Sequence, residues 1–489
     1  MSQSLTSRTV QALSWSFVES ASVRGIRLFF GIVLARLLSP EQFGLVAMLT
    51  IFVAVAQSFL DSGFGAALIQ KQDTTHLDTC SVFYFNIVMG MAVAGFLCLT
   101  APYIAAFYSQ PLLTPLMRVL SLTIVINSFG LIQNTILTKE IDFKTQTKVN
   151  VMASLLSGVV GVTMALRGFG IWSLAGQQIC STLSGTILLW FFNSWRPALI
   201  FSLEALKKMF GFGSRILASG LLNTVFDNIY LVAIGKLFSP VDLGFYTRAS
   251  LFQEVPSQTV SAMVGRVTFP VLASIQSDTA GLKRGTRKAL IAVALVNFPM
   301  MVGLAVIARP LILVLLTDRW AESISYLQLL TFLGLLYPLH VINLSLLQAL
   351  GRSKLLLRLE IVKKALIVIN IAVTCRWGLS GMIYGMMAMS LISYYLNCYY
   401  TGVLIGYPFW EQLRDVLPSL FVALIMGIVV SVTGLLGFPN DWIRLLVQIF
   451  VGVLAYAATC RLLRLRAFME ILRETCDALP FSKASKVVS

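Results

Sequence analysis

The chain has 489 residues, of which 57% are hydrophobic and 12% are charged, and its formal net charge is +16. Soluble domains carry about 25% charged residues, and no polar stretch in this chain is long enough to build a soluble core. Apolar stretches recur at near-regular intervals and are long enough to cross a bilayer, which takes about 20 residues each. The composition therefore excludes a soluble protein and indicates an all-α polytopic membrane protein.

About 14 apolar segments are predicted to be transmembrane helices, because each is long enough to span the hydrocarbon core. In chain order they cover residues 12–36, 43–65, 80–103, 115–137, 149–166, 170–192, 209–236, 243–270, 289–308, 324–349, 359–375, 379–405, 416–436 and 441–460. We predict an N-terminal six-helix lobe, a C-terminal six-helix lobe, a final helix pair and a basic tail. These parts correspond to residues 1–208, 209–410, 411–460 and 461–489.

Two octets share their Leu, Ser, Pro and Gly residues in register: LLSPEQFG at 37–44 and LFSPVDLG at 237–244. Each is predicted to start a helix, with Ser39 or Ser239 as the N-cap and Pro at the first helical position. Each octet also follows the first helix of its six-helix set, and an even number of helices gives both sets the same orientation. The chain is therefore predicted to hold two parallel repeats, related by a pseudo-two-fold axis along the membrane normal.

Basic residues are shared unevenly between the two ends of the predicted helices. Segments on the side of the N-terminus carry 22 of the 37 Lys and Arg residues, whereas the opposite loops carry six. This asymmetry follows the positive-inside rule and predicts that both termini are cytoplasmic. The basic residues are expected to orient the protein in the membrane and to contact anionic lipid head groups. No nucleic-acid partner is expected. The stretch from Arg461 to Arg473 is predicted to be an interfacial anchor.

Several arginines fall inside predicted helices, where ionisable groups are costly and mark candidate functional sites. Arg24 and Arg27 are three residues apart and share one face of the first helix. Arg248 and Arg266 share a face of helix 243–270 but lie about 27 Å apart along its axis, one near each end of a cavity. Arginine forks match phosphate oxygens and keep their charge when desolvated. These arginines are therefore predicted to bind an anionic ligand, best a lipid with a phosphate-bearing head group.

Four acidic residues are predicted to serve in coupling or gating, two of them on the first two helices of each repeat. They are Glu19, Asp61, Asp227 and Glu254. The coupling ion would be H⁺ or Na⁺, and no other cofactor is expected. Arg27 and Asp227 hold the same position in the two repeats, so they either pair between the lobes or are each satisfied within their own lobe. Salt bridges that only fix helix packing, such as Glu19–Arg27, are the alternative role for any single arginine.

The seven cysteines and two histidines show no spacing typical of zinc ligation or of a disulfide framework. His340 is predicted to pack or hydrogen-bond within its helix, and Glu360 is predicted to pair with Lys364, four residues on. The sequence holds no nucleotide-binding motif and no nucleophile constellation, and its predicted outer loops are short. An enzyme is therefore not expected.

Five separated segments carry a family resemblance: LLSPEQFGLVAM, LDSGFGAALIQ (60–70), LFSPVDLGFY, GFGIWSLAGQQ and ALGRSKLLLRLEIVKK (349–364). The chain resembles, over most of residues 10–405, the polysaccharide-transporter branch of the MOP exporter superfamily. Within it, the chain is most similar to Wzx-type flippases of the colanic-acid and teichuronic-acid exporter kind. The resemblance implies a 14-helix, two-lobe, V-shaped fold. It also implies export of undecaprenyl-diphosphate-linked oligosaccharide repeat units across the bacterial inner membrane by alternating access.

The resemblance also bears on the site and on partners. Relatives that flip the peptidoglycan precursor use arginines of helices 1, 2 and 8, and Arg24, Arg27 and Arg248 match these by helix. Helix 43–65 offers Asp61 and no arginine in its core, a departure that speaks against a peptidoglycan role. The implied role is in exopolysaccharide or lipopolysaccharide biosynthesis, as a monomer alongside polysaccharide polymerase and export machinery. The alternative is an ion-coupled small-molecule antiporter of the multidrug type from the same superfamily.

Overall fold

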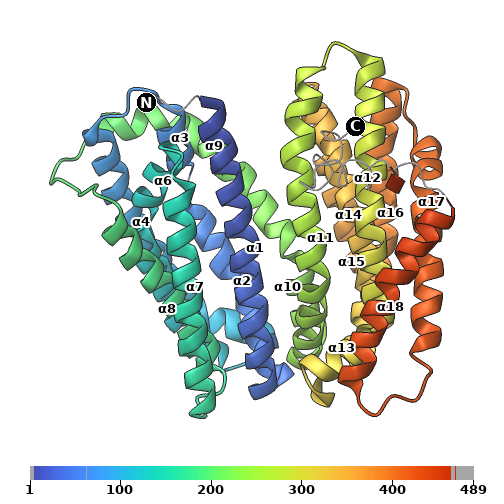
Figure 1. Ribbon diagram of the computed structural model, residues 1–489. Coiled ribbons are helices and arrows are strands. Elements are labelled where there is room, and N and C mark those ends of the chain that lie inside the picture. Colours follow the sequence, from blue (N-terminus) through green and yellow to red (C-terminus); the bar gives the residue numbers. More distant parts are fainter. Residues whose placement is uncertain (1–4, 62, 464–467, 470–489) are drawn as a thin grey trace, which may run out of the picture. The chain divides into compact units, whose positions relative to one another are not determined.

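The computed structural model describes residues 5–61, 63–463 and 468–469, and in these residues every regular element is a helix. The chain divides into two compact units, Met1–Thr247 and Arg248–Ser489, and the division falls inside α11 (Pro240–Ser274). Each unit is a bundle of long helices that run alongside one another (Figure 1). The predicted all-α architecture is confirmed for the described residues. The predicted interfacial anchor and basic tail lie largely outside them.

The first unit consists of α1 to α10 and the start of α11. Their bounds are α1 (Leu5–Leu37), α2 (Pro40–Asp61), α3 (Phe64–Gln70), α4 (His76–Tyr108), α5 (Leu113–Ser128), α6 (Leu131–Lys139), α7 (Phe143–Leu166), α8 (Trp172–Phe192), α9 (Leu203–Asp227) and α10 (Ile229–Leu237). The long helix α7 packs along both α1 and α8, and α4 packs along α5. Sequence analysis assigns α9 and α10 to the second lobe, whereas the structure groups them with this unit because they pack against α2.

Three apolar stretches that are predicted as continuous helices are broken in the structure. α2 and α3 are separated at Gly63, whose φ of 69° lies in the left-handed region that glycine adopts at little cost. α5 and α6 are bent by 44° around Gly130, and α9 and α10 are bent by 41° at Asn228. Hydropathy does not register these breaks, because the apolar run continues through them.

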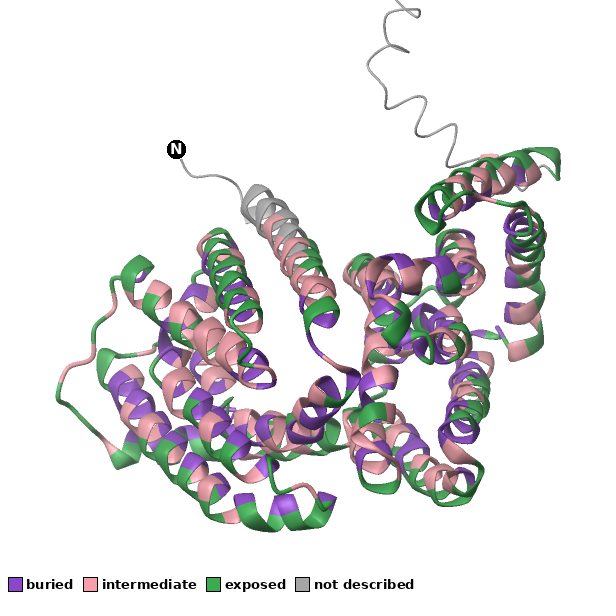
Figure 2. Ribbon diagram, turned by 90° about the horizontal axis from the view of Figure 1, so that it is seen from below, coloured by how far each residue is buried: buried purple, intermediate pink, exposed green. Residues whose placement is uncertain are grey.

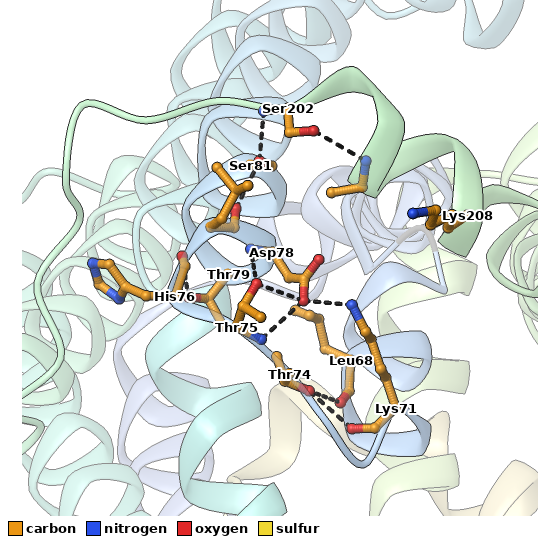
Figure 3. Close-up of polar contacts among 12 residues, drawn as sticks. Leu68, Lys71, Thr74, Thr75, His76, Asp78, Thr79, Ser81, Ser202 and Lys208 are labelled. Carbon is orange, nitrogen blue, oxygen red and sulfur yellow. Dashed lines mark hydrogen bonds and ion pairs between the residues drawn. The ribbon is translucent and has the colours of Figure 1, made fainter.

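A polar network holds the turn between α3 and α4 (Figure 3). Thr75 and Asp78 form a capping box: Asp78 N–H donates to Thr75 Oγ1 at 3.2 Å, and Thr75 N–H donates to Asp78 Oδ2 at 2.9 Å. Lys71 Nζ lies 2.5 Å from the same carboxylate oxygen. Lys139, the last residue of α6, donates to the carbonyl oxygens of Leu68 at 3.0 Å and Lys71 at 2.6 Å. These contacts fix the ends of α3, α4 and α6 relative to one another.

The second unit consists of the rest of α11 and the helices that follow it. Their bounds are α12 (Thr279–Val306), α13 (Ala308–Leu315), η1 (Asp318–Trp320), α14 (Ser323–Ala349), α15 (Ser353–Thr374), η2 (Cys375–Trp377), α16 (Gly378–Ile405), α17 (Phe409–Thr433) and α18 (Asp441–Leu462). α12 packs against α14 and α17, α14 packs against α16, and α17 packs against α18. A cluster of buried apolar residues from α12, α14, α16 and α17 forms the core of this unit.

Ion pairs of Lys283 and Arg287 tie α12 to α17. Lys283 Nζ lies 2.7 Å from Glu411 Oε2, and Arg287 Nη2 lies 2.5 Å from Asp415 Oδ1. Tyr407 donates to Asp415 Oδ2 at 2.7 Å. Burial, together with this hydrogen bond, raises the pKa of Tyr407, so the phenol keeps its proton and acts as a donor. Sequence analysis places α17 outside the two repeats, and the structure makes it part of the second unit's core.

The structure has seven helical stretches long and apolar enough to cross a membrane, and nine when each bent pair counts as one span, among the described residues. Each of the about 14 segments predicted from hydropathy overlaps a described helix or helix pair. Large apolar side chains are widely exposed, including Leu99 at 77% and Phe191 at 78%. Exposed and buried residues alternate along most helices (Figure 2). An apolar exterior of this extent is expected of helices that face lipid.

Candidate functional site

The two octets LLSPEQFG and LFSPVDLG, both in the first unit, lie against each other at the starts of α2 and α11. A Cβ atom at Gly44 would lie 1.7 Å from the carbonyl oxygen of Pro240. The reciprocal contact is also present, since a Cβ atom at Gly244 would lie 1.9 Å from the carbonyl oxygen of Pro40. Both positions therefore require glycine. The contact pairs equivalent residues of the two octets, as a local two-fold arrangement demands.

The second octet caps its helix as predicted, and the first shows one half of the predicted cap. Ser39 N–H donates to Gln42 Oε1 at 3.1 Å at the start of α2. At the start of α11, Asp242 N–H donates to Ser239 Oγ at 3.1 Å, and Ser239 N–H donates to Asp242 Oδ2 at 3.2 Å. The second octet thus forms a complete capping box with Asp in the position that Gln holds in the first.

Three predicted site residues lie on α1. Glu19 Oε1 accepts a hydrogen bond from Asn150 Nδ2 of α7 at 2.6 Å. Among the ion pairs of the described residues there is none between Glu19 and Arg27, so the alternative packing role assigned to that pair is wrong. Arg24 is half-buried and Arg27 is exposed. The pairing of Arg27 with Asp227, an exposed residue that ends α9, stays a prediction.

The other two predicted arginines, Arg248 and Arg266, are half-buried on α11 in the second unit. Glu254 of the same helix accepts hydrogen bonds from Ser250 Oγ at 2.5 Å and from Gln258 Nε2 at 3.4 Å. Spaced four residues apart, these three side chains form a polar stripe on one face of α11. Because the arginines of α1 and α11 belong to different units, the site predicted to unite them stays a prediction.

Asp61 is the last residue of α2 and lines a cavity of about 350 Å³ in the first unit. The other polar side chains of the lining are Ser58, Asn86, Asn134, Thr135 and Thr138. Sequence analysis missed Asn86, although a lone amide in the apolar segment 80–103 is a usable signal. The bend around Gly130 brings Asn134, Thr135 and Thr138 of α6 to the same cavity.

A second cavity of the first unit, of about 790 Å³, lies between α2, α4 and α10. Its lining is almost entirely apolar and includes Phe52, Phe59, Phe96 and Phe107. Such a lining suits hydrocarbon and offers nothing to a charged head group.

In the second unit, His340 of α14 packs against the ring of Tyr394, in line with its predicted packing role. Its ring nitrogens face α16 rather than its own helix: Nδ1 lies 3.0 Å from Asn397 Nδ2 and Nε2 lies 3.4 Å from Ser390 Oγ. Glu360 pairs with Lys363, three residues on, at 2.7 Å; the predicted pair of Glu360 with Lys364 stays a prediction. Nowhere in the described ranges do three or more His, Cys, Asp or Glu residues form a group that could hold a metal ion.

Known proteins resemble this chain along most of its length. It is 27% identical over 355 residues to the teichuronic acid biosynthesis protein TuaB of Bacillus subtilis (strain 168), covering 72% of this chain and 73% of that protein. It is 27% identical over 444 residues to the lipopolysaccharide biosynthesis protein WzxC of Escherichia coli (strain K12), covering 88% and 89%. The structure is similar to that of the lipid II flippase MurJ in an inward closed conformation, with a TM-score of 0.77, 14% identity and coverage of 93% and 98%.

The long apolar helices define a multi-pass membrane protein, and its fold is similar to that of a solved flippase. The profile of the family described as polysaccharide biosynthesis protein matches residues 33–325, and the chain belongs to this family. The predicted resemblance to a polysaccharide family is confirmed, and the fold is similar to that of a solved transporter of the MOP superfamily, with a TM-score of 0.59 and 16% identity.

Proposed function

We propose that this protein is a flippase that moves undecaprenyl-diphosphate-linked oligosaccharide repeat units across the bacterial inner membrane for exopolysaccharide or lipopolysaccharide biosynthesis. The observation that carries the proposal is the match along nearly the whole chain to WzxC, a lipopolysaccharide biosynthesis protein, within a polysaccharide biosynthesis family. The fold of a lipid II flippase supports it, because that fold hosts transport of a lipid-linked sugar in MurJ.

The proposed mechanism is alternating access in a chain with 14 membrane crossings and both termini in the cytoplasm. Two parallel repeats around a central site suit this mechanism. The reciprocal contact of Gly44 with Pro240 and of Gly244 with Pro40 supports the repeat, because it relates equivalent positions by a local two-fold.

The arginines proposed to bind the pyrophosphate of the lipid carrier are Arg24, Arg27, Arg248 and Arg266. Guanidinium groups can hold phosphate oxygens bidentately, and they stay charged when desolvated. The polyprenyl tail stays in the bilayer while the head group crosses. The glycan contacts other polar groups of the same pathway, and Glu19, Asp227 and Glu254 serve in gating.

Reconstitution into liposomes tests this function. A fluorescent polyprenyl-diphosphate-linked sugar is placed in both leaflets, and a membrane-impermeant quencher reports how fast the lipid changes leaflet. We expect translocation by the wild-type chain. For Arg24→Ala and Arg27→Ala we expect glycolipid binding at least tenfold weaker, because each removes a charge-assisted hydrogen bond worth about 1.5–3 kcal/mol.

Arg319→Ala is the matched control, because Arg319 is an exposed arginine of η1. Undetectable translocation together with unchanged glycolipid binding by both α1 variants would overturn the proposal. Exchange of a small cationic dye without lipid translocation would identify the antiporter instead.

A further inference from the structure

The polar cavity that Asp61 lines has the features of an ion site. It lies where two broken helices meet: α2 ends at Asp61, and α6 begins just after the bend around Gly130. The last carbonyl groups of a helix have no intrahelical partner and carry the negative end of its dipole. In membrane transporters, such interrupted helices supply carbonyl and side-chain oxygens to coupling cations.

Asn86 points to a ligand independently of the acidic group. Its side chain, on α4, is only 4% exposed and lines the cavity. Its Oδ1 atom is buried and has no hydrogen-bond partner. A buried acceptor without a partner costs about 1–3 kcal/mol. A bound cation in the cavity would satisfy this oxygen.

The charge of the cavity also calls for a cation. Asp61 is the only ionisable residue of the described lining, which contains no Lys or Arg. No ion pair involves Asp61 within the described part of the chain. A carboxylate at the end of α2 is repelled by the negative end of the helix dipole. A positive ion beside it would offset this repulsion.

Hydroxyl groups complete the oxygen donors. Ser58 Oγ donates to Ala54 O at 3.1 Å, and Thr135 Oγ1 donates to Leu131 O at 2.8 Å. Each hydroxyl has one hydrogen and two lone pairs. Ser58 Oγ also lies 2.8 Å from Thr224 Oγ1 of α9, which then donates to it. Because each hydrogen is taken by a carbonyl of its own helix, one lone pair of Ser58 Oγ and those of Thr135 Oγ1 remain to coordinate an ion.

The walls of the cavity are fixed by contacts outside it. A Cβ atom at Gly63 would lie 2.2 Å from Gly213 O, so the backbones of α3 and α9 touch beside the cavity. Lys139 anchors the end of α6 to the turn after α3. A site held on rigid helix ends can select an ion by size and geometry.

We propose that this cavity binds one Na⁺ ion through the Asp61 carboxylate, Asn86 Oδ1 and the Ser58 and Thr135 hydroxyl oxygens. A single carboxylate balances a monovalent ion, whereas Ca²⁺ sites recruit more carboxylate ligands. All of the donors are oxygens, which hard cations prefer. The inference rests on the proposed function only for its consequence, which is that a Na⁺ gradient drives export.

Na⁺ binding can be measured without any glycolipid, on the full-length protein in lipid nanodiscs. The probes are ²²Na⁺ binding and the shift of the thermal unfolding midpoint in NaCl against choline chloride at equal ionic strength. We expect saturable ²²Na⁺ binding and a Na⁺-specific rise of the midpoint, because a ligand that binds only the folded state stabilises it. Asp61→Asn should weaken Na⁺ binding at least tenfold, and Asn86→Leu should also weaken it.

Glu41→Gln is the matched control, because it removes an exposed carboxylate from the same helix. If Asp61→Asn does not fold, Thr135→Val replaces it, since this change keeps the shape and removes one ligand oxygen. No ²²Na⁺ binding by the wild type, equal binding by Asp61→Asn, or a midpoint that responds to pH but not to Na⁺ would each overturn the inference. The liposome assay of glycolipid translocation is independent of these Na⁺-binding measurements, so it judges the proposed function separately.

Discussion

Asp78 is a buried carboxylate whose Oδ2 atom accepts from three donors at the start of α4. Thr75 N–H and Thr75 Oγ1 both donate to it at 2.9 Å, and Lys71 Nζ lies 2.5 Å away. Capping and charge compensation are therefore combined in one side chain. Loss of either partner would leave a desolvated group unpaired, which is why this position should be sensitive to substitution.

We predict that Asp78→Asn lowers the free energy of unfolding by about 1–3 kcal/mol, because the Lys71 ammonium loses its counter-charge and the capping box weakens. The measurement is thermal or denaturant unfolding of the purified protein in nanodiscs. Asp73→Asn, in the exposed part of the same turn, is the control and should change stability little. Equal stability of the two variants would show that the network contributes nothing.

Single side chains also show where sequence reasoning stops. Spacing permits Glu360 to pair with either the third or the fourth residue after it, and the structure shows the pair with Lys363. Asn86 stands out in sequence as an amide in an apolar segment. Its unpartnered oxygen becomes visible only when α4 is placed beside the cavity.

Among the helices, close backbone approaches occur at glycines that the sequence marks in different ways. Gly44 and Gly244 are part of a repeated octet, so the sequence marks them as important. The sequence does not reveal that the two octets contact each other. Gly63 and Gly213 belong to no repeat and still bring α3 and α9 together. Small residues allow such approaches in membrane helices.

We predict that Gly44→Ala and Gly244→Ala each destabilise the protein by about 1–3 kcal/mol, because the added methyl group overlaps a backbone carbonyl that cannot move aside alone. The matched control is Gly25→Ala on α1, where an added Cβ meets no atom within 4 Å. There the helix gains up to about 1 kcal/mol from the better propensity of alanine. Unfolding midpoints of the three variants provide the comparison, and a wild-type midpoint for Gly44→Ala would contradict it.

The division of the chain into units follows packing rather than the sequence repeat. α9 and α10 open the second repeat by sequence, yet they pack on α2 in the first unit. α17 lies outside the repeat, yet it contributes to the core of the second unit and pairs with Lys283 and Arg287 of α12.

We predict that a chain ending at Gly406, without α17 and α18, does not yield a monodisperse protein. The truncation exposes the buried face of α12 and leaves two cations without their carboxylates, which costs more than a typical single substitution. Size-exclusion chromatography in detergent measures the outcome. A chain ending at Leu463 retains these contacts and should remain monodisperse. A stable product from the shorter chain would show that the second unit folds without α17.

Hydropathy and spacing determined that this is an all-helical membrane protein, roughly where its helices lie and that its octets start helices. These are properties of local segments, and burial in lipid imposes them on each segment separately. The family resemblance came separately, from five segments of the sequence. The breaks at Gly63 and Asn228, the octet contact and the cavity of Asp61 and Asn86 were decided by packing. They depend on which helices meet and at what depth, and a one-dimensional apolar pattern carries no record of that.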